Sequence, residues 1–179
     1  MINYQVEKIL NDADLTDLKS LFDMLPEGLA HQDYNLFDVD KRTIPSKNFI
    51  APLNKIRNRG ENNNSLKLMA HYFVKYEKDS FTKMNNDDEK VVKQTIVTMI
   101  ETKNLVGGDT LVLDKYVKTS RPKNKYAKRA GKKAPVNHDI IPDIVKLKDG
   151  ESVIYDGKVL HGVTKVHEAH RIVLVSWFK

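Results

Sequence analysis

Short runs of strand-forming residues, separated by turn-forming ones, fill the chain from Leu66 to its C-terminus. Val, Ile, Tyr, Phe and Thr are frequent in these runs, and Asn, Asp and Gly are frequent in the turns. The runs are LMAHYFVKY, QTIVTMIE, DTLVLDKYV, DIVKLK, SVIYD and RIVLVSWF, and the turns include KMNNDDE, NLVGGD, KDGE and YDGK. Because many short strands in a small chain must cover each other's apolar faces, this pattern predicts a mainly β sandwich or jelly roll.

A helix is predicted before the strands. The segment DADLTDLKSLFDML, residues 12–25, begins with aspartates, which favour a helix N-terminus. Its apolar side chains recur at helical spacing: Leu15, Leu18, Leu21, Phe22 and Leu25. We expect this amphipathic helix to pack against one sheet. The polar run RGENNNS, Arg59–Ser65, predicts an exposed loop between the helical and the strand-rich parts.

The length and composition of the chain limit how many domains it can form. A chain of 179 residues with 40% hydrophobic content can form one compact domain that buries its own core. We expect a single domain over 1–179, with N-terminal helical support over 1–65 and a β core over 66–179. The chain has no cysteine, which excludes disulfides, thiolate metal sites and a cysteine nucleophile.

The N-terminal stretch and the hydropathy pattern bear on location. MINYQVEKILNDADL lacks the basic start and the apolar block of a signal peptide. No apolar run approaches the roughly 20 residues that a membrane span needs. The absence of cysteine is compatible with a reducing compartment. We therefore expect a soluble, cytoplasmic protein that does not interact with membranes.

The positive charge of the chain is concentrated in one segment. The net charge is +6, yet KYVKTSRPKNKYAKRAGKK, residues 115–133, carries nine Lys and Arg residues and no acidic one. The rest of the chain is therefore about 3 units negative. A basic insertion over 115–138 could contact an acidic protein surface or nucleic acid, with Lys128, Arg129, Lys132 and Lys133 as candidate substrate-binding residues. The alternative is a solvated loop, which is what charge runs usually form.

The C-terminal block, VKLKDGESVIYDGKVLHGVTKVHEAHRIVLVSWFK, contains two residues suited to hold a metal and an anion. A strand, a tight DGE turn, a second strand and a last strand starting at Arg171 are predicted here. This order would place His161 and Arg171 on neighbouring strands of a barrel. An imidazole and a guanidinium side by side suit a metal ion next to an anion.

This block resembles the 2-oxoglutarate- and iron(II)-dependent dioxygenases, specifically the small prolyl-4-hydroxylase-like group that includes the PKHD-type hydroxylases. In that group the second iron-binding histidine follows a GxxxxY/F strand, and an arginine ten residues later binds the distal carboxylate of 2-oxoglutarate. These positions are His161 and Arg171 here. Upstream, NLVGGDTLVLD resembles the family's GGEL strand, so the resemblance runs from about Leu66 to the C-terminus. It implies a double-stranded β-helix (jelly roll) with an N-terminal supporting helix.

The family's H-x-D iron motif aligns with Asn85 and Asp87 in YEKDSFTKMNNDDEK. Tyr76 sets this frame, because it precedes the motif at the usual nine-residue distance. The resemblance thus implies that Asp87 and His161 bind iron, with Asn85 in place of the first histidine. Iron(II) oxygenases use two imidazoles and one carboxylate, and an amide oxygen is a neutral, weaker donor. The resemblance also implies that Arg171 and Tyr76 bind 2-oxoglutarate, and it allows ascorbate as a further cofactor.

Ordinary structural roles compete with each of these assignments. NNDD is a common turn composition, a lone histidine is more often structural, and an arginine that opens a strand is usually a surface charge. The order of the residues, with GGD between them and the histidine-to-arginine interval kept, favours the metal site over a chance match. Two alternatives exist for the missing ligand. His31 and Asp33 form a literal H-x-D but precede the strands, and His138 closes the basic segment and could fold back toward the metal.

Three functions are compatible with these residues. The first is hydroxylation of a protein or peptide side chain, prolyl by resemblance, with O2 and 2-oxoglutarate as co-substrates and no catalytic side chain beyond the metal ligands. The second is the same chemistry on a nucleic acid gripped by the basic segment. The third is a binding protein on a dioxygenase scaffold that has lost metal chemistry together with the histidine.

Overall fold

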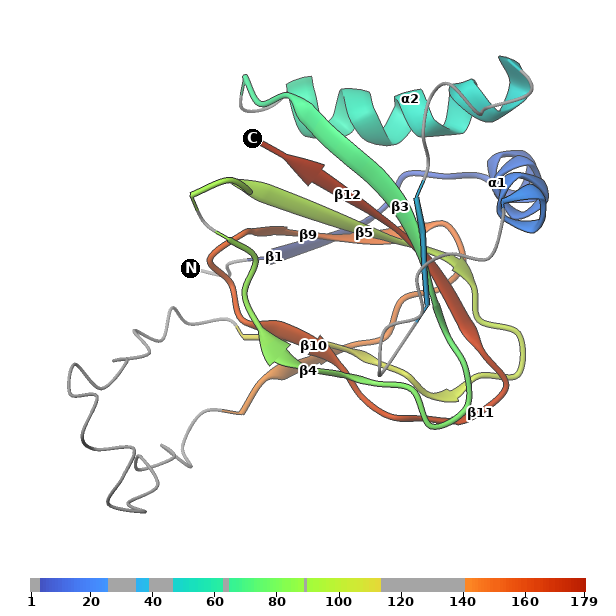
Figure 1. Ribbon diagram of the computed structural model, residues 1–179, viewed down its shortest axis with the longest axis vertical. Helices are drawn as coiled ribbons and strands as arrows, with labels where there is room; N and C mark the ends of the chain where they lie inside the picture. The colour runs from blue at the N-terminus through green and yellow to red at the C-terminus, as the bar shows by residue number, and fades with distance from the viewer. Residues whose placement is uncertain (1–3, 26–34, 39–46, 63–64, 89, 114–140) are drawn as a thin grey trace.

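The computed structural model describes residues 4–25, 35–38, 47–62, 65–88, 90–113 and 141–179. Two helices and twelve strands lie in this part of the chain (Figure 1). In chain order they are β1 (Tyr4–Lys8), α1 (Asp12–Met24), β2 (Asn35–Asp38), α2 (Lys47–Asn62), β3 (Leu68–Tyr76), β4 (Thr82–Asn85), β5 (Gln94–Glu101), β6 (Val106–Gly107), β7 (Thr110–Val112), β8 (Asp143–Val145), β9 (Glu151–Asp156), β10 (His161–Val163), β11 (Val166–Glu168) and β12 (Arg171–Phe178).

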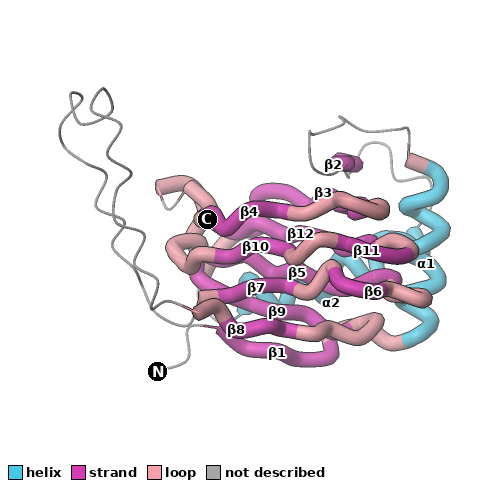
Figure 2. Tube along the Cα trace, turned by 90° about the horizontal axis from the view of Figure 1, so that it is seen from below, coloured by secondary structure: helices cyan, strands magenta, loops and turns pink. Residues whose placement is uncertain are grey.

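Two antiparallel sheets face each other and form the body of the molecule. The larger sheet has the order β1-β9-β5-β12-β3-β2, and the smaller has the order β4-β10-β7-β8. β6 and β11 form a separate two-stranded sheet, which lies beyond one end of the smaller sheet in Figure 2. Figure 2 shows the smaller sheet stacked over the larger one, with both helices behind them. The predicted mainly β fold is confirmed.

Alternation of side chains along the strands of the larger sheet creates two apolar layers. Successive strand residues point to opposite faces, so Val173 and Val175 of β12 enter the space between the sheets, whereas Leu174 faces the helices. Both faces of this sheet are therefore covered. This explains why β5 has seven consecutive buried residues, including the polar Gln94, Thr95 and Thr98.

The helix predicted over residues 12–25 is α1. Its N-cap residue is Asn11, and of the aspartates predicted to favour the helix start, Asp14 takes part in the cap. The Asn11 side chain accepts a hydrogen bond from the Asp14 backbone N–H, and the Asp14 carboxylate accepts one from the Asn11 N–H, both at 2.9 Å. Leu15, Leu18 and Leu21 are buried against the larger sheet. The predicted amphipathic packing is confirmed.

The polar loop predicted over Arg59–Ser65 is wrong in its first half, because α2 continues to Asn62. Gly60 lies in this last part of the helix, where an added Cβ would sit 2.2 Å from the ring of Phe178. Glycine thus allows the helix to approach β12 closely enough for the aromatic ring to pack on its backbone. This tertiary contact stabilises the end of a helix whose composition suggests a loop.

The N-terminal part contributes strands as well as helical support. β1 pairs with β9 and β2 pairs with β3, so these two strands form the edges of the larger sheet. Neither was predicted, because both are short edge strands whose polar residues weaken the alternating pattern. Neither of the two helices in the described ranges has the length and apolar character to cross a lipid bilayer.

Candidate active site

Asp87 and His161 lie together in the space between the two sheets. Asp87 follows β4, and His161 is the first residue of the adjacent strand β10. The His161 Nε2 atom is 4.0 Å from the Asp87 Oδ1 atom, and the two side chains are only 16% and 10% exposed. The sequence-predicted imidazole and carboxylate are therefore brought together in a largely buried position.

The remaining polar atoms of this pair are already engaged. His161 Nδ1 lies 3.0 Å from the Val159 carbonyl oxygen, and because a carbonyl only accepts, Nδ1 carries the proton. In the neutral imidazole, the lone pair of Nε2 then faces Asp87 Oδ1. Asp87 Oδ2 accepts a 2.5 Å hydrogen bond from the Thr95 hydroxyl. Two acceptors facing each other, each oriented by a supporting hydrogen bond, is the arrangement that metal ligands adopt.

Asn85 lies directly opposite His161 in the pairing of β4 with β10. Directly opposed residues of an antiparallel pair point to the same face of the sheet, so the backbone places Asn85 on the face that carries His161. Its side chain is exposed, however, and its amide donates to the Lys83 carbonyl at 2.9 Å. In the part of the chain that the structure describes, no third His, Cys, Asp or Glu completes a metal-binding group with Asp87 and His161.

Arg171 and His161 lie in different sheets, so the prediction that they occupy neighbouring strands is wrong. β10 pairs with β4 and β7, whereas β12 pairs with β3 and β5. The chain crosses from the smaller sheet to the larger one between these strands, as strands of a two-sheet β structure commonly do. The two residues therefore face the same interior from opposite walls.

Arg171 is almost fully buried, with 1% of its surface exposed. Its Nη1 donates to the Gly108 carbonyl at 2.5 Å and its Nη2 to the Thr110 hydroxyl at 2.7 Å, while Nε has no partner. Burial lowers the pKa of Arg171, and the Tyr76, Tyr155 and Asp109 side chains act in the opposite direction. No carboxylate among the described residues forms an ion pair with Arg171. A buried guanidinium without a counter-ion is unfavourable by itself, so this position favours a bound anion.

The GGD segment contains the Gly108 carbonyl, one of the groups that orient Arg171. Gly107 and Gly108 have φ angles of 76° and 64°, in the left-handed region that glycine adopts without strain. This turn places the Gly108 carbonyl against the guanidinium. The sequence analysis noted GGD for its position in the chain but did not predict this contact.

Tyr76 lies beside Arg171. The two residues are directly opposed in the pairing of β3 with β12, and the guanidinium carbon is 5.5 Å from the centre of the Tyr76 ring. A guanidinium over a tyrosine ring is stabilised by the electron-rich face of the ring. The Tyr76 hydroxyl is hydrogen-bonded to the Thr82 hydroxyl at 2.9 Å.

Tyr155 is a site residue that sequence reasoning missed. Its ring is stacked on the imidazole of His161, with 4.7 Å between the ring centres and 34° between the planes. Burial raises the pKa of Tyr155 well above its usual range, and the Asp87 charge and the Tyr76 hydroxyl add to the rise, while Arg171 opposes it. Tyr155 is the aromatic residue of the GxxxxY/F pattern, but that pattern served only to locate the strand before His161.

Several solved structures share this fold. An oxidoreductase of the 2OG-Fe(II) oxygenase family from Burkholderia pseudomallei has a TM-score of 0.69 at 16% identity, covering 99% of this chain and 84% of its own. HygX from Streptomyces hygroscopicus, with nickel and 2-oxoglutarate bound, has a TM-score of 0.73 at 12% identity, covering 99% and 82%. A prolyl-4-hydroxylase from Pseudomonas putida has a TM-score of 0.64 at 14% identity, covering 100% and 93%. The chain has the fold of the 2-oxoglutarate- and Fe(II)-dependent oxygenases.

The likeness to the oxygenase fold is one of structure. No protein-family model matches the sequence, and no curated protein matches it. The agreement extends over nearly the whole chain, so the predicted jelly roll with its supporting helices is confirmed. At 11–16% identity the neighbours establish the oxygenase fold alone.

Several predicted residues lie outside the described part of the oxygenase fold. These are the basic insertion with Lys128, Arg129, Lys132 and Lys133, and the alternative ligands His31, Asp33 and His138. Their roles stay predictions. The cytoplasmic location likewise stays a prediction.

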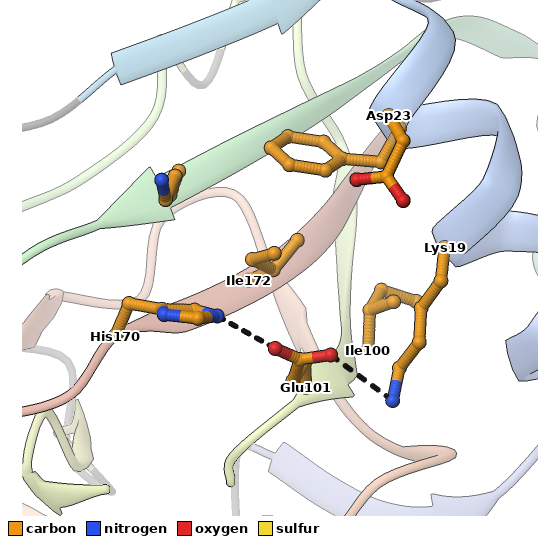
Figure 3. Close-up of a pocket in the computed structure, with 8 residues that line it drawn as sticks. Lys19, Asp23, Ile100, Glu101, His170 and Ile172 are labelled. Atoms are coloured by element: carbon orange, nitrogen blue, oxygen red, sulfur yellow. Dashed lines mark hydrogen bonds and ion pairs between the residues drawn. The ribbon is translucent and has the colours of Figure 1, made fainter.

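A cavity of about 300 Å³ lies between α1 and the larger sheet (Figure 3). Glu101 lines it, and its carboxylate is 2.6 Å from His170 Nε2 and 3.2 Å from the Lys19 ammonium. Burial raises the pKa of Glu101, but the hydrogen bonds from His170 and Lys19 outweigh it and the net shift is downward. These contacts join helix α1 to the residue that precedes Arg171.

Proposed function

We propose that the protein is a 2-oxoglutarate-dependent iron(II) dioxygenase that hydroxylates a side chain of a protein or peptide. The observation that carries this proposal is Arg171, a buried guanidinium with a free Nε–H that faces the same interior as Asp87 and His161. Such a cation favours an anionic ligand. In an oxygenase fold with an imidazole and a carboxylate across the interior, 2-oxoglutarate is the ligand that best satisfies these groups.

Asp87 and His161 fit two positions of an iron site. Each presents an acceptor atom to the other, and each is oriented by a hydrogen bond from Thr95 or to Val159. Iron(II) bound there would supply the redox chemistry through which O2 and 2-oxoglutarate react. Asn85 would be the third protein ligand, but its exposed amide is engaged with Lys83. We therefore expect weaker iron binding than a second histidine would give.

Arg171 and Tyr76 would hold 2-oxoglutarate. Nη1 and Nη2 of Arg171 are committed to Gly108 and Thr110, so the Nε–H and the positive charge remain for the distal carboxylate. The Tyr76 ring supports the guanidinium from one side. Buried valines line the same interior and exclude water, which strengthens the attraction between the opposite charges.

Prolyl hydroxylation of a protein or peptide is the substrate assignment that the resemblance favours. The likeness to a prolyl-4-hydroxylase in fold is compatible with it. Hydroxylation of a nucleic acid is the alternative that the basic segment 115–133 suggests. Binding to oligonucleotides that weakens steeply with salt, in the absence of binding to proline-containing peptides, would favour the nucleic acid.

A binding protein without turnover is a second candidate function, and the position of Asn85 favours it. An exposed amide that donates to its own strand leaves the metal with two protein ligands among the described residues. In that case 2-oxoglutarate would bind through Arg171 without being decarboxylated. Release of succinate by the protein with added iron(II) distinguishes the enzyme from the binding protein.

Titration of 2-oxoglutarate into the Mn(II)-loaded protein under anaerobic conditions tests the cofactor assignment. We expect Arg171→Met to weaken binding at least about 30-fold, because removing one partner of a buried charge pair costs about 2 kcal/mol or more. Arg57→Met is the control, because Arg57 is a partly exposed helical arginine paired with Glu61. An unchanged dissociation constant in a folded Arg171→Met variant would refute the assignment.

A further inference from the structure

A carboxylate on the neighbouring strand is one step out of register with Arg171. β12 pairs with β5 regularly from Phe178 back to Val173, which lies opposite Met99. Two further regular steps would place Glu101 directly opposite Arg171. Directly opposed side chains of antiparallel strands point to the same face, with Cβ atoms about 4.5–5.5 Å apart, so the two residues would form an ion pair.

A β-bulge at the end of β5 prevents this ion pair. Ile172 lies opposite Glu101 rather than Ile100, so β5 has one extra residue here. Glu101 therefore points to the same face as Ile172, and both side chains line the cavity beneath α1. Arg171 points to the other face, where its guanidinium contacts Gly108. The bulge thus places the carboxylate and the guanidinium on opposite faces of the larger sheet.

Two side chains bind Glu101 on the outer face of the larger sheet, the face covered by α1 (Figure 3). The His170 Nε2–H donates a hydrogen bond to one carboxylate oxygen at 2.6 Å, and the Lys19 ammonium lies 3.2 Å from the other. The Glu101 side chain is 22% exposed, so solvent weakens these contacts only in part. They stabilise the outward orientation of Glu101 and, with it, the bulge.

We propose that this bulge is a specificity device for the anion site: it turns the Glu101 carboxylate away from Arg171, and Lys19 and His170 hold it there, so that the guanidinium remains available to an anionic ligand. This inference rests on the proposed function, because it takes 2-oxoglutarate as that ligand. In the regular register, Glu101 would neutralise Arg171 and compete with the carboxylate of the ligand.

The regular register is accessible because the bulge lies at the end of its strand. β5 ends at Glu101, so only the turn at residues 102–105 has to rearrange for the carboxylate to move opposite Arg171. The position of Glu101 depends on the balance between its outer partners, Lys19 and His170, and the buried guanidinium, which is unfavourable without a counter-ion. Removal of the outer partners should shift Glu101 toward Arg171.

A variant without the outer partners tests this role of Glu101. Lys19→Met and His170→Phe are combined, and 2-oxoglutarate is titrated anaerobically into the Mn(II)-loaded protein. We expect binding roughly 10-fold weaker than in the parent, because Glu101 then competes for Arg171. Adding Glu101→Gln to this double variant should restore the affinity to within about threefold of the parent, because a neutral amide does not compensate the guanidinium charge.

Glu77→Gln is the matched control for this restoration. Glu77 is an exposed carboxylate that pairs with Lys75 at 2.8 Å, and its replacement should not restore the affinity of the double variant. Glu101→Gln alone should bind 2-oxoglutarate within about twofold of the parent, because in the parent the carboxylate already faces away from the ligand.

Two results would refute the assigned role of Glu101 while the proposed function stands. In the first, the double variant binds 2-oxoglutarate like the parent, or Glu101→Gln does not restore its binding. In the second, Glu101→Gln alone loses as much affinity as the double variant, because the carboxylate would then support the site. If the parent itself does not bind 2-oxoglutarate, the role of Glu101 and the proposed function are both wrong.

Urea unfolding shows whether each variant keeps its fold. Should the double variant not fold, Lys19→Met decides alone, because Lys19 is a partly exposed residue of α1 and methionine is a good helix former. We then expect roughly threefold weaker binding of 2-oxoglutarate, restored by Glu101→Gln. Unchanged binding in that variant would refute the assigned role of Glu101.

Discussion

At the residue scale, the site depends on which atoms of each side chain are already engaged. His161 and Asp87 each commit one polar atom to a supporting partner and leave one atom facing the gap between them. Asn85, opposite His161, commits its amide to the Lys83 carbonyl and is exposed. An asparagine is shorter than a histidine, and its amide forms local backbone hydrogen bonds readily. If Asp87 and His161 bind a metal as proposed, the backbone places Asn85 next to that site, but its side chain is not oriented as a ligand.

We predict that Asn85→His raises metal affinity by at least about 10-fold and raises succinate release, because it completes the two-imidazole, one-carboxylate face. Asp87→Ala should abolish whatever binding the parent has. Calorimetric titration of Mn(II), the redox-silent substitute for iron(II), measures both. Asp88→Ala is the control, because Asp88 is exposed and its carboxylate accepts from the Lys90 N–H.

One combination of results would contradict the metal site. If Asn85→His binds Mn(II) no better than the parent and His161→Ala binds it no worse, Asp87 and His161 are not ligands. The proposed iron chemistry would then be abandoned, and the oxygenase fold would stand on the structural likeness alone.

At the scale of elements, α1 is attached to the larger sheet by a polar cluster as well as by apolar packing. Lys19 of α1 and His170, which precedes β12, both contact Glu101 at the end of β5. Asp23 of α1 and Lys75 of β3 line the same cavity (Figure 3). This cluster lies next to the start of β12, the strand that positions Arg171.

We predict that acid weakens this attachment. The folded protein lowers the pKa of Glu101 from its ordinary value of 4.5, so Glu101 stabilises the fold above that pH and loses this contribution as the pH falls through the lower, folded value. Glu101→Gln should therefore make the free energy of unfolding less dependent on pH in acid. The difference should be under about 1 kcal/mol, because ion pairs at partly exposed sites contribute little.

Urea unfolding between about pH 6 and about pH 3 measures this pH dependence. Glu168→Gln, at an exposed position on β11, is the control for the loss of one carboxylate. If the free energies of unfolding of the parent and of Glu101→Gln differ by the same amount at every pH, Glu101 has the same pKa in the folded and the unfolded protein.

A second charged pair lies near His170. Lys75 and Glu77 form an ion pair at 2.8 Å, and Lys75 is the main cause of the lowered pKa of Glu77.

At the scale of the whole molecule, the excess positive charge is concentrated in one segment. Residues 115–133 carry nine positive charges, and the rest of the chain is about 3 units negative. A concentrated basic segment on an otherwise mildly acidic protein attracts acidic partners at long range. We therefore expect this segment to affect the binding of a partner more than the stability of the fold.

We predict that replacing Lys128, Arg129, Lys132 and Lys133 with serine leaves the melting temperature within about 2 °C of the parent, because charges at solvated positions contribute little to stability. The same variant should bind an acidic peptide or an oligonucleotide more weakly, and the salt dependence of binding should decrease. Thermal unfolding and fluorescence anisotropy measure the two effects. A large loss of stability would mean that the segment packs as part of the structure.

The sequence by itself determined the fold class and the longer strands β3, β5, β9 and β12, and it named the candidate residues Asp87, His161 and Arg171. Alternation and turn residues are local properties, so β3 and β12 were found from their runs, and the order of Asp87, His161 and Arg171 was enough to suggest a metal next to an anion. Tertiary structure decided what depends on distant contacts. It placed His161 and Arg171 on opposite walls, extended α2 beneath Phe178, and stacked Tyr155 on His161. These features could not be predicted locally, because each is fixed by packing between segments far apart in the chain.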